Sequence, residues 1–339
     1  MQSESYLTMK KSKLNKSGVK FAITGGAGFV GYNLMLLLEK EFIKPIFYII
    51  DDLSSSTLND PFLPNNNIEK GRITWIKASI STLDLTEVFD KVDIVIHLAA
   101  KGNVVQSIEL PIDNFNSNVV STLHILDCLR NSSCNKLIFS STGGALMGNT
   151  EPPVDEMSLP SPISPYGSSK LACEGYIKSF SHVYDLDACI FRFGNVYGPY
   201  CLHKQGVFNK FANAFLDEQE IVIYGDGSST RDYVNVYDIC MGIISGCHGL
   251  LSNSLRAYNC FHLSSGVQTS LNQLCDYFIK ASDRKPKVTY LPKRKGEVEV
   301  NFADYSRALQ ALEYSPTISI QKGVAEFYAW YLSSRIIKR

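Results

Sequence analysis

The chain contains 339 residues, of which 33 are basic and 33 acidic, so its formal net charge is zero. This length allows a large core in one domain or in two coupled domains. The balanced charge gives no support to a nucleic-acid-binding protein or to a protein held on an anionic membrane, and no apolar run approaches the roughly 20 residues of a membrane-spanning helix.

The N-terminal segment, residues 1–18, is polar and carries four lysines. It lacks the apolar stretch of a signal peptide, so we expect a disordered lead-in. The nine cysteines of the chain are scattered without C-x-x-C spacing. That pattern favours reduced thiols in the cytoplasm over a disulfide framework, and it predicts no metal site.

Short apolar runs alternate with amphipathic stretches of helical period, such as residues 32–40 and 107–130. The runs are rich in β-branched and aromatic residues and are predicted strands: 20–24, 46–50, 73–77, 93–99, 136–141 and 188–193. This alternation predicts an α/β fold with a doubly wound parallel sheet. After about residue 195 it gives way to loops that contain Gly, Asn and Ser, which predicts a smaller second domain with segments that return to the first.

A glycine motif, "TGGAGFVG" at residues 24–31, comes after the first predicted strand and opens the first predicted helix. Glycines in such a turn let a pyrophosphate approach the backbone N–H groups of a helix N-terminus. We therefore predict a dinucleotide site that includes Gly25, Gly28, Phe29, Val30 and Gly31. A glycine triplet that only packs a tight turn is the alternative.

The second predicted strand leads into Asp51 and Asp52, and Asp51 lies 20 residues beyond Gly31. A carboxylate at this distance can accept hydrogen bonds from both ribose hydroxyls of an adenosine. It would also repel a 2′-phosphate, so the sequence favours NAD over NADP. A turn residue that opens the loop "DDLSSS" is the alternative interpretation of Asp51.

A tyrosine and a lysine stand four residues apart at Tyr166 and Lys170, in "SPYGSSK". On a helix these side chains share one face and lie one turn apart. The spacing alone is weak support for a catalytic pair, because Tyr6 and Lys10 in the polar N-terminus match it too.

Six motifs occur in a fixed order: the glycine motif, "DDLSSS", "HLAA" (97–100), "SSTGGALMG" (140–148), "SPYGSSK" (164–170) and "RFGNVYGP" (192–199). Together they resemble the extended short-chain dehydrogenase/reductases of the NAD-dependent epimerase/dehydratase family, and within it the nucleotide-sugar 4-epimerases. The resemblance implies a Rossmann-type sheet with a smaller C-terminal α/β domain that binds the nucleotide sugar. We expect the NAD-binding domain at 19–195, with segments of about 230–265 returning to it, and the substrate domain in most of 196–339.

The resemblance implies catalytic roles for Tyr166, Lys170 and Thr142, with Ser141 beside them. Tyr166 would be the acid/base, and Lys170 would lower its pKa and hold the nicotinamide ribose. A cation about 4 Å away contributes roughly 4 kcal/mol at an effective dielectric constant of ~20, enough to bring a phenol pKa toward neutrality. The Thr142 hydroxyl would hydrogen-bond the reacting sugar oxygen, and a hydroxyl that only satisfies the loop backbone is the alternative.

Further cofactor contacts carried over from the resemblance are Ser79, Ile80, Ala99, Ala100, Lys101, Asn118 and Phe193. The substrate contacts carried over are Thr142, Tyr166, Asn195, Val207, Arg231, Arg294, Glu297 and Asn301. The two arginines would clamp the substrate diphosphate, because a guanidinium suits bidentate recognition of anions. Solvated loop charges are the alternatives for Lys101 and Glu297, and core packing is the alternative for Asn118 and Phe193.

The two residues after Thr142 predict the reaction. Sugar-nucleotide 4,6-dehydratases carry Asp-Glu there, whereas this chain has Gly143 and Gly144, which offer neither an acid nor a base. We therefore expect an NAD-dependent epimerase that inverts C4 of a UDP-hexose or UDP-N-acetylhexosamine. The alternatives are a nucleotide-sugar dehydrogenase or reductase that releases its cofactor, and a non-catalytic NAD-binding sensor.

By the same resemblance, the helices at about 107–130 and 165–183 would pair in a homodimer.

Some positions depart from the family pattern. Ser79 replaces a common aspartate, Met147 a common tyrosine, and Asn235 and Tyr237 a common His and Asp. These departures concern the sugar more than the chemistry.

Overall fold

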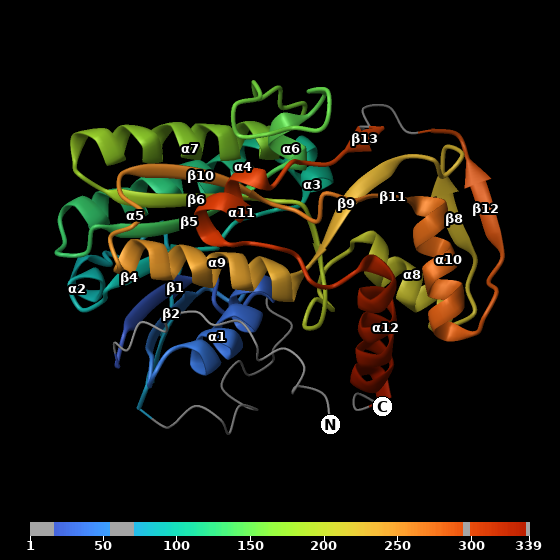
Figure 1. Cartoon of the computed structure of the whole chain (residues 1–339), viewed down its shortest axis with the longest axis horizontal. Helices are drawn as coiled ribbons and strands as arrows, with labels where there is room; N and C mark the ends of the chain where they lie inside the picture. The colour runs from blue at the N-terminus through green and yellow to red at the C-terminus, as the bar shows by residue number, and fades with distance from the viewer. Residues whose placement is uncertain (1–16, 55–70, 294–298, 337–339) are drawn as a thin grey trace.

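A computed structural model describes residues 17–54, 71–293 and 299–336 (Figure 1). Most of the predicted lead-in therefore lies outside the described residues. Among the helices that the structure describes, none is long and apolar enough to cross a membrane.

The centre of the molecule is a parallel sheet of seven strands in the order β10-β6-β5-β4-β1-β2-β3. Its strands are β1 (Lys20–Thr24), β2 (Ile46–Asp51), β3 (Ile73–Lys77), β4 (Ile94–His97), β5 (Lys136–Thr142), β6 (Asp187–Phe193) and β10 (Tyr258–Leu263). From β1 the chain builds outward through β2 and β3, then crosses to β4 on the other side. The order reverses between β1 and β4, where doubly wound sheets bind their ligands. The predicted fold class is confirmed.

Helices cover both faces of this sheet, with α1 (Phe29–Glu41) and α9 (Val236–Leu251) on one side and α5 (Ser121–Arg130) and α7 (Pro165–Val183) on the other (Figure 1). Successive residues of a strand point to opposite faces. In β1, Phe21 and Ile23 therefore join the core under α1 and α9, whereas Ala22 joins the core under α5 and α7. The near-continuous apolar strands result from burial on both faces.

The predicted helix at 107–130 is divided in the structure. It consists of α3 (Val104–Glu109), α4 (Pro111–Phe115), a π-helical turn η2 (Asn116–Val120) and α5. Pro111 explains the first division, because proline lacks an N–H group and favours the first position of a new helix. The π-helical turn, which accommodates one extra residue, accounts for the second.

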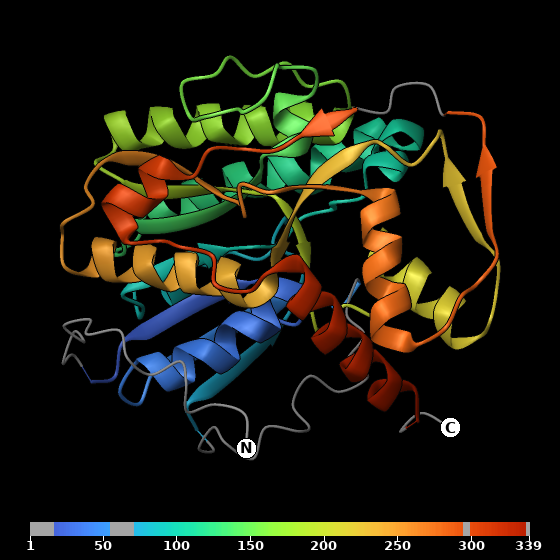
Figure 2. The ribbon, with the colours of Figure 1, turned by 45° about the vertical axis from the view of Figure 1, so that its right-hand side comes forward.

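The remaining chain forms a smaller group of elements beside the sheet (Figure 2). Its helices α8 (Val207–Leu216), α10 (Leu271–Ser282) and α12 (Ile320–Ile336) pack through aromatic side chains, with Phe278 contacting Phe208 and Phe327 edge to face. Strands β8 (Ile221–Tyr224) and β12 (Val288–Leu291) pair in parallel. The short helices are α2 (Thr86–Phe89), α6 (Gly144–Met147) and α11 (Ser306–Leu312).

A second small sheet bridges the two parts of the molecule. Its strands are β7 (Asn195–Tyr197), β9 (Thr230–Asn235), β11 (Gln268–Ser270) and β13 (Val300–Asn301). β9 pairs with β7 and β13 in parallel and with β11 in antiparallel orientation. Because β7 comes directly after the last residues of β6, this sheet begins at the carboxyl end of the main sheet.

Candidate functional site

Helix α7 carries Tyr166 in its first turn and Lys170 in its second. The helix begins with Pro165, and the Ser164 hydroxyl accepts a 3.2 Å hydrogen bond from the backbone N–H of Gly167. A serine cap followed by proline is a strong local start signal. The sequence therefore determines the position of Tyr166 relative to the N-terminus of α7.

The loop after β5 packs directly against this first turn. A Cβ atom on Gly167 would lie 2.1 Å from the carbonyl oxygen of Ala145, so only glycine permits this approach. The Thr142 side chain forms a hydrogen bond with the Tyr166 side chain. From the other side Gly102 faces the tyrosine, since a Cβ there would lie 3.7 Å from its hydroxyl oxygen. The structure thus brings Thr142 and Tyr166 together, as predicted.

Lys170 is buried, with 2% of its surface exposed. Its ammonium donates a 2.8 Å hydrogen bond to the Ser140 carbonyl oxygen and lies 4.5 Å from the centroid of the Phe139 ring. Burial lowers the lysine pKa to about 8, and the nearby Cys173 and Glu174 oppose this shift.

The expected lowering of the Tyr166 pKa does not come from the protein groups. Burial raises the pKa of this phenol to about 12, and the hydrogen bond with Thr142 only partly opposes the increase. Removing a phenol from water disfavours its charged form. Here that penalty exceeds the effect of the Thr142 hydrogen bond, and Lys170 does not lower the phenol pKa, so the expectation that the lysine lowers it is wrong for the protein groups alone.

Ser141 lies apart from the tyrosine. Its hydroxyl donates a 2.6 Å hydrogen bond to Glu174 of α7, and Glu174 forms a buried 2.7 Å ion pair with Arg192 of β6. Neighbouring residues of a strand face opposite ways, so Ser141 cannot share the orientation of Thr142. We therefore leave Ser141 out of the proposed catalytic set. Sequence reasoning missed Glu174, although it continues the spacing of four begun by Tyr166 and Lys170.

The predicted dinucleotide cradle lies at the switch point of the sheet. Gly25 has φ +71°, and a Cβ there would lie 2.7 Å from the backbone nitrogen of Ala99. Gly28 is the N-cap of α1 and provides no side-chain cap, so the helix N-terminus is open to an anion. Phe29, Val30 and Gly31 form the first turn of α1. This cradle fits the pyrophosphate of NAD.

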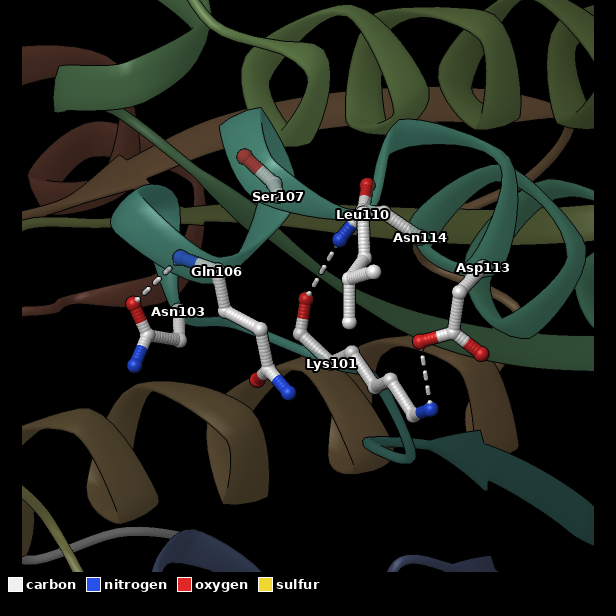
Figure 3. A pocket seen from close by; sticks show the side chains of 7 residues that line it. All are labelled: Lys101, Asn103, Gln106, Ser107, Leu110, Asp113 and Asn114. Carbon is white, nitrogen blue, oxygen red and sulfur yellow. Dashed lines mark hydrogen bonds and ion pairs between the residues drawn. The ribbon is translucent and has the colours of Figure 1, made fainter.

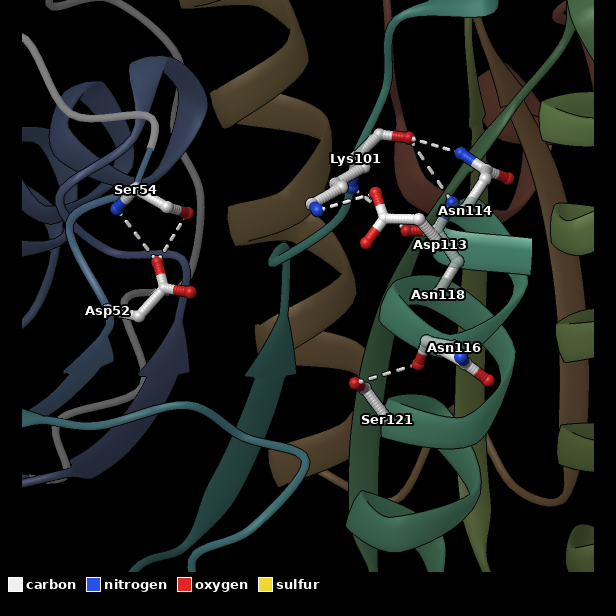
Figure 4. A network of polar contacts seen from close by, with 8 residues as sticks. All are labelled: Asp52, Ser54, Lys101, Asp113, Asn114, Asn116, Asn118 and Ser121. Atoms are coloured by element: carbon white, nitrogen blue, oxygen red, sulfur yellow. Dashed lines mark hydrogen bonds and ion pairs between the residues drawn. The ribbon is translucent and has the colours of Figure 1, made fainter. Parts of the chain in front are cut away.

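The Asp51 carboxylate stands at the end of β2, where the adenosine ribose was predicted. Its oxygens accept hydrogen bonds from the backbone N–H groups of Ala27 at 3.0 Å and Leu53 at 2.8 Å. Burial raises the pKa of Asp51, and these two bonds oppose the increase. Asp52 instead accepts bonds from the backbone and hydroxyl of Ser54 (Figure 4), which is a turn contact.

Ser79 and Ile80 come after β3 at the same edge. The Ser79 hydroxyl pairs with the Ser81 hydroxyl at 2.8 Å, and Ile80 is buried. They lie beside β2, which ends at Asp51.

The side-chain amide of Asn118 is hydrogen-bonded to the backbone of Lys101. The Asn118 side chain accepts a 2.8 Å bond from the Lys101 N–H, and it donates to the Lys101 carbonyl oxygen and to Ser169 of α7. The Lys101 ammonium forms a 2.7 Å ion pair with Asp113 beside a small pocket (Figures 3 and 4). The structure thus places Asn118 as a support between helix α7 and the loop that contains Ala99 and Ala100.

Three of the predicted substrate residues, Asn195, Arg231 and Asn301, lie on strands of the small sheet. Asn301 of β13 is opposite Arg231 of β9, and a Cβ on Gly144 would lie 3.1 Å from the Asn301 side-chain oxygen. The loop after Thr142 is also tied to Phe193, whose carbonyl oxygen accepts a 2.8 Å bond from Gly143.

Asn195 begins β7, and Val207 begins α8. Arg294 and Glu297 lie outside the described residues. Of the departures, Met147 is fully buried and Asn235 caps α9 by accepting a bond from Tyr237, so both have structural roles.

The model of the NAD dependent epimerase/dehydratase family matches residues 21–246. The chain belongs to this family. It is 33% identical over 315 residues to a putative UDP-glucose 4-epimerase of Methanocaldococcus jannaschii, and the match covers 91% of this chain and 97% of the relative.

Two solved structures of epimerases resemble the chain closely. A UDP-N-acetylglucosamine 4-epimerase from Methanobrevibacter ruminantium is 29% identical, with a TM-score of 0.84 over 94% of this chain and 100% of the other. A UDP-glucuronic acid 4-epimerase from Bacillus cereus, solved with UDP-glucuronic acid and NAD, is 25% identical, with a TM-score of 0.85 over 93% and 100%. The cofactor of this epimerase family is NAD, as the glycine motif and Asp51 predicted.

We expect the buried Glu174–Arg192 pair to be sensitive to the loss of one partner. Glu174→Gln leaves the Arg192 charge buried without its counter-charge, so we expect the free energy of unfolding to fall by about 3–5 kcal/mol. Replacing both residues by methionine should destabilise less than the single change, because no unpaired charge remains. Urea denaturation measures both.

The exposed pair of Arg130 and Asp127 provides the matched control. Asp127→Asn should lower the free energy of unfolding far less than Glu174→Gln does, because solvent screens that pair. A loss for Glu174→Gln no larger than that of Asp127→Asn would contradict the importance of the buried pair.

Proposed function

We propose that the protein is an NAD-dependent UDP-sugar 4-epimerase. The observation that carries the proposal is the position of Thr142 at the carboxyl end of β5 beside Tyr166 and Lys170 of α7, in a sheet whose switch point holds a glycine cradle that fits a dinucleotide. The similarity over more than nine-tenths of the chain to UDP-sugar 4-epimerases supports the same reaction.

In the proposed reaction Tyr166 removes the proton of the sugar C4 hydroxyl and later returns it. NAD, when bound, supplies the hydride acceptor and a positive charge beside the reacting carbon. Thr142, which already hydrogen-bonds the tyrosine, would hold the sugar oxygen during the transfer. Lys170, one helical turn away, would hold the nicotinamide ribose, as the family likeness implies.

The loop beside the tyrosine argues against elimination of water. Gly143 and Gly144 carry no acid or base, and Asn301 packs against Gly144. Oxidation and reduction at one carbon therefore remain the reaction that these residues support. The intact hydrogen bond between Thr142 and Tyr166 also disfavours a sensor that only binds NAD, because binding requires neither group.

The proposed substrates are UDP-hexoses and UDP-N-acetylhexosamines. Arg231 would bind the diphosphate, with Arg294 and Glu297 completing the nucleotide site by family likeness. Asn301 would border the C2 substituent, and its amide can hydrogen-bond an acetamido carbonyl.

We further propose a homodimer through the helices α3, α4, η2, α5 and α7. These helices expose several large apolar side chains: Val105, Ile108, Leu110, Ile112, Phe115, Val120, Tyr176 and Val183. A chain that stays monomeric rarely exposes so many on neighbouring helices.

We also propose that the NAD-binding domain ends at residue 195 and that residues of about 230–265 return to it. A cytoplasmic location is proposed as well, and the nine unpaired buried cysteines support it.

Removing the Tyr166 hydroxyl tests the reaction. Tyr166→Phe should lower turnover of UDP-sugars by a factor of about 10² or more, because it removes the proton acceptor. Binding of NAD and of the UDP-sugar should stay within a few-fold. Epimer formation is followed by NMR, and absorbance reports whether NADH accumulates.

Tyr176, which is half exposed on the same helix, provides the control, and Tyr176→Phe should keep its activity within twofold. If Tyr166→Phe retains a tenth of the activity, the acid/base assignment is wrong. Net accumulation of NADH by the parent protein would support a dehydrogenase in place of an epimerase.

Asn301→Tyr tests the substrate site. The larger ring should obstruct an N-acetyl group, so kcat/KM for UDP-N-acetylglucosamine should fall about 30- to 150-fold more than that for UDP-glucose. Asn301→Ser is the small-residue control and should keep both substrates within a few-fold. Equal losses on the two substrates, with unchanged melting temperature, would overturn the assignment.

Ile112→Glu tests the dimer, because Ile112 is 73% exposed on α4. We expect light scattering to give the mass of two chains for the parent at micromolar concentration and a dimer at least tenfold weaker for the variant. Val267→Glu, at an exposed position before β11, should leave the mass unchanged. A parent with the mass of one chain would rule out the proposed dimer.

A further inference from the structure

The loop between β7 and α8, residues 198–206, lies across the start of α1. The Asn33 side chain of α1 donates a 3.0 Å hydrogen bond to the Pro199 carbonyl oxygen, and Tyr32 packs edge to face on Tyr200 with ring centroids 4.7 Å apart. Tyr200 has φ +65°, a left-handed conformation uncommon for residues other than glycine. The loop is therefore held firmly against the helix that begins at the glycine cradle.

The far half of the loop is fixed from α8. The side-chain amide of Asn209 donates hydrogen bonds of 2.6 Å to the carbonyl oxygens of both Cys201 and Lys204. Asn209 is buried, so these bonds are shielded from water. The backbone of Lys204 thus has a defined position before any ligand arrives.

The Lys204 ammonium extends toward the first residue of α1. It lies 6.0 Å from the centroid of the Phe29 ring, and it forms no ion pair with any carboxylate of the described ranges. Its side chain is exposed to solvent, yet burial by the surrounding protein lowers its pKa. The exposed ammonium is therefore accessible to a ligand at the start of α1.

The neighbouring His203 adds no second positive charge. Burial and the charge of Lys204 lower the pKa of this histidine to about 4, so its ring is neutral near pH 7. Lys204 is therefore a preorganised cation at the start of a helix whose N-terminus has no side-chain cap. A helix N-terminus and an ammonium both attract anions.

We propose that Lys204 binds the pyrophosphate of NAD from the side opposite the glycine motif. The loop from β7 to α8 would then hold the cofactor down on α1, and the resident cofactor would stay bound through each turnover. This inference rests on the NAD site of the proposed function. It adds a residue outside the sequence motifs, on an element that begins the second part of the chain.

The experiment compares four ligands on the full-length chain freed of bound nucleotide. NAD and ADP-ribose contain the adenosine-linked pyrophosphate, adenosine contains no phosphate, and UDP contains the substrate diphosphate. Calorimetric titration should show that Lys204→Gln weakens NAD and ADP-ribose about 10- to 100-fold, the range expected for one charge-assisted hydrogen bond. Adenosine and UDP should change less than threefold.

Two variants serve as controls. Lys204→Arg keeps the charge and should stay within about threefold of the parent for every ligand. Lys210→Gln removes an exposed lysine of α8 from the same region and should have no effect on binding. Equal melting temperatures for the variants establish that the fold is intact.

Three results would overturn the inference. NAD affinity within twofold of the parent in Lys204→Gln would show that the lysine does not bind the cofactor. A loss for UDP without a loss for NAD would assign the lysine to the substrate diphosphate. An equal loss for adenosine would indicate a damaged site instead of a lost phosphate contact. A parent protein that binds no NAD would instead contradict the proposed function itself.

Discussion

The buried ion pair between Glu174 and Arg192 holds helix α7 on the sheet. Glu174 lies one turn of α7 beyond Lys170, and Arg192 belongs to β6, so the pair fixes the rotation of the helix as well as its position. Ser141 of β5 satisfies the same carboxylate. With the helix fixed in this way, Tyr166 lies beside Thr142 at the carboxyl end of β5.

The two buried charged groups of α7, Glu174 and Lys170, differ in how their charges are compensated. The Glu174–Arg192 pair is internally neutralised, and its contribution lies in orientation. Lys170 is also buried, and burial lowers its pKa, while its ammonium contacts a carbonyl oxygen and an aromatic face.

Much of the fold could be predicted because the signals are local. The strand at 20–24, the glycine turn and the serine–proline start of α7 each depend on neighbouring residues, and the structure has them at those positions. Contacts between distant segments could not be predicted. Nothing near Asn301 in the sequence indicates that it lies opposite Arg231, and the balance between burial and charge at Tyr166 depends on the folded surroundings. The orientation of Ser141 could have been predicted from strand alternation.

The π-helical turn at Asn116–Val120 fixes the number of residues between α4 and α5. Beyond it, Thr122 hydrogen-bonds the buried His97 of β4 at 3.1 Å, while Asn118 within it reaches back to Lys101. An α-helix turns by about 100° per residue. Deleting one residue here would tighten the turn into an ordinary helix and rotate every later side chain of α5 by that angle, which would withdraw Thr122 from His97. The spacing between these two polar contacts is therefore as constrained as the identity of the residues that make them.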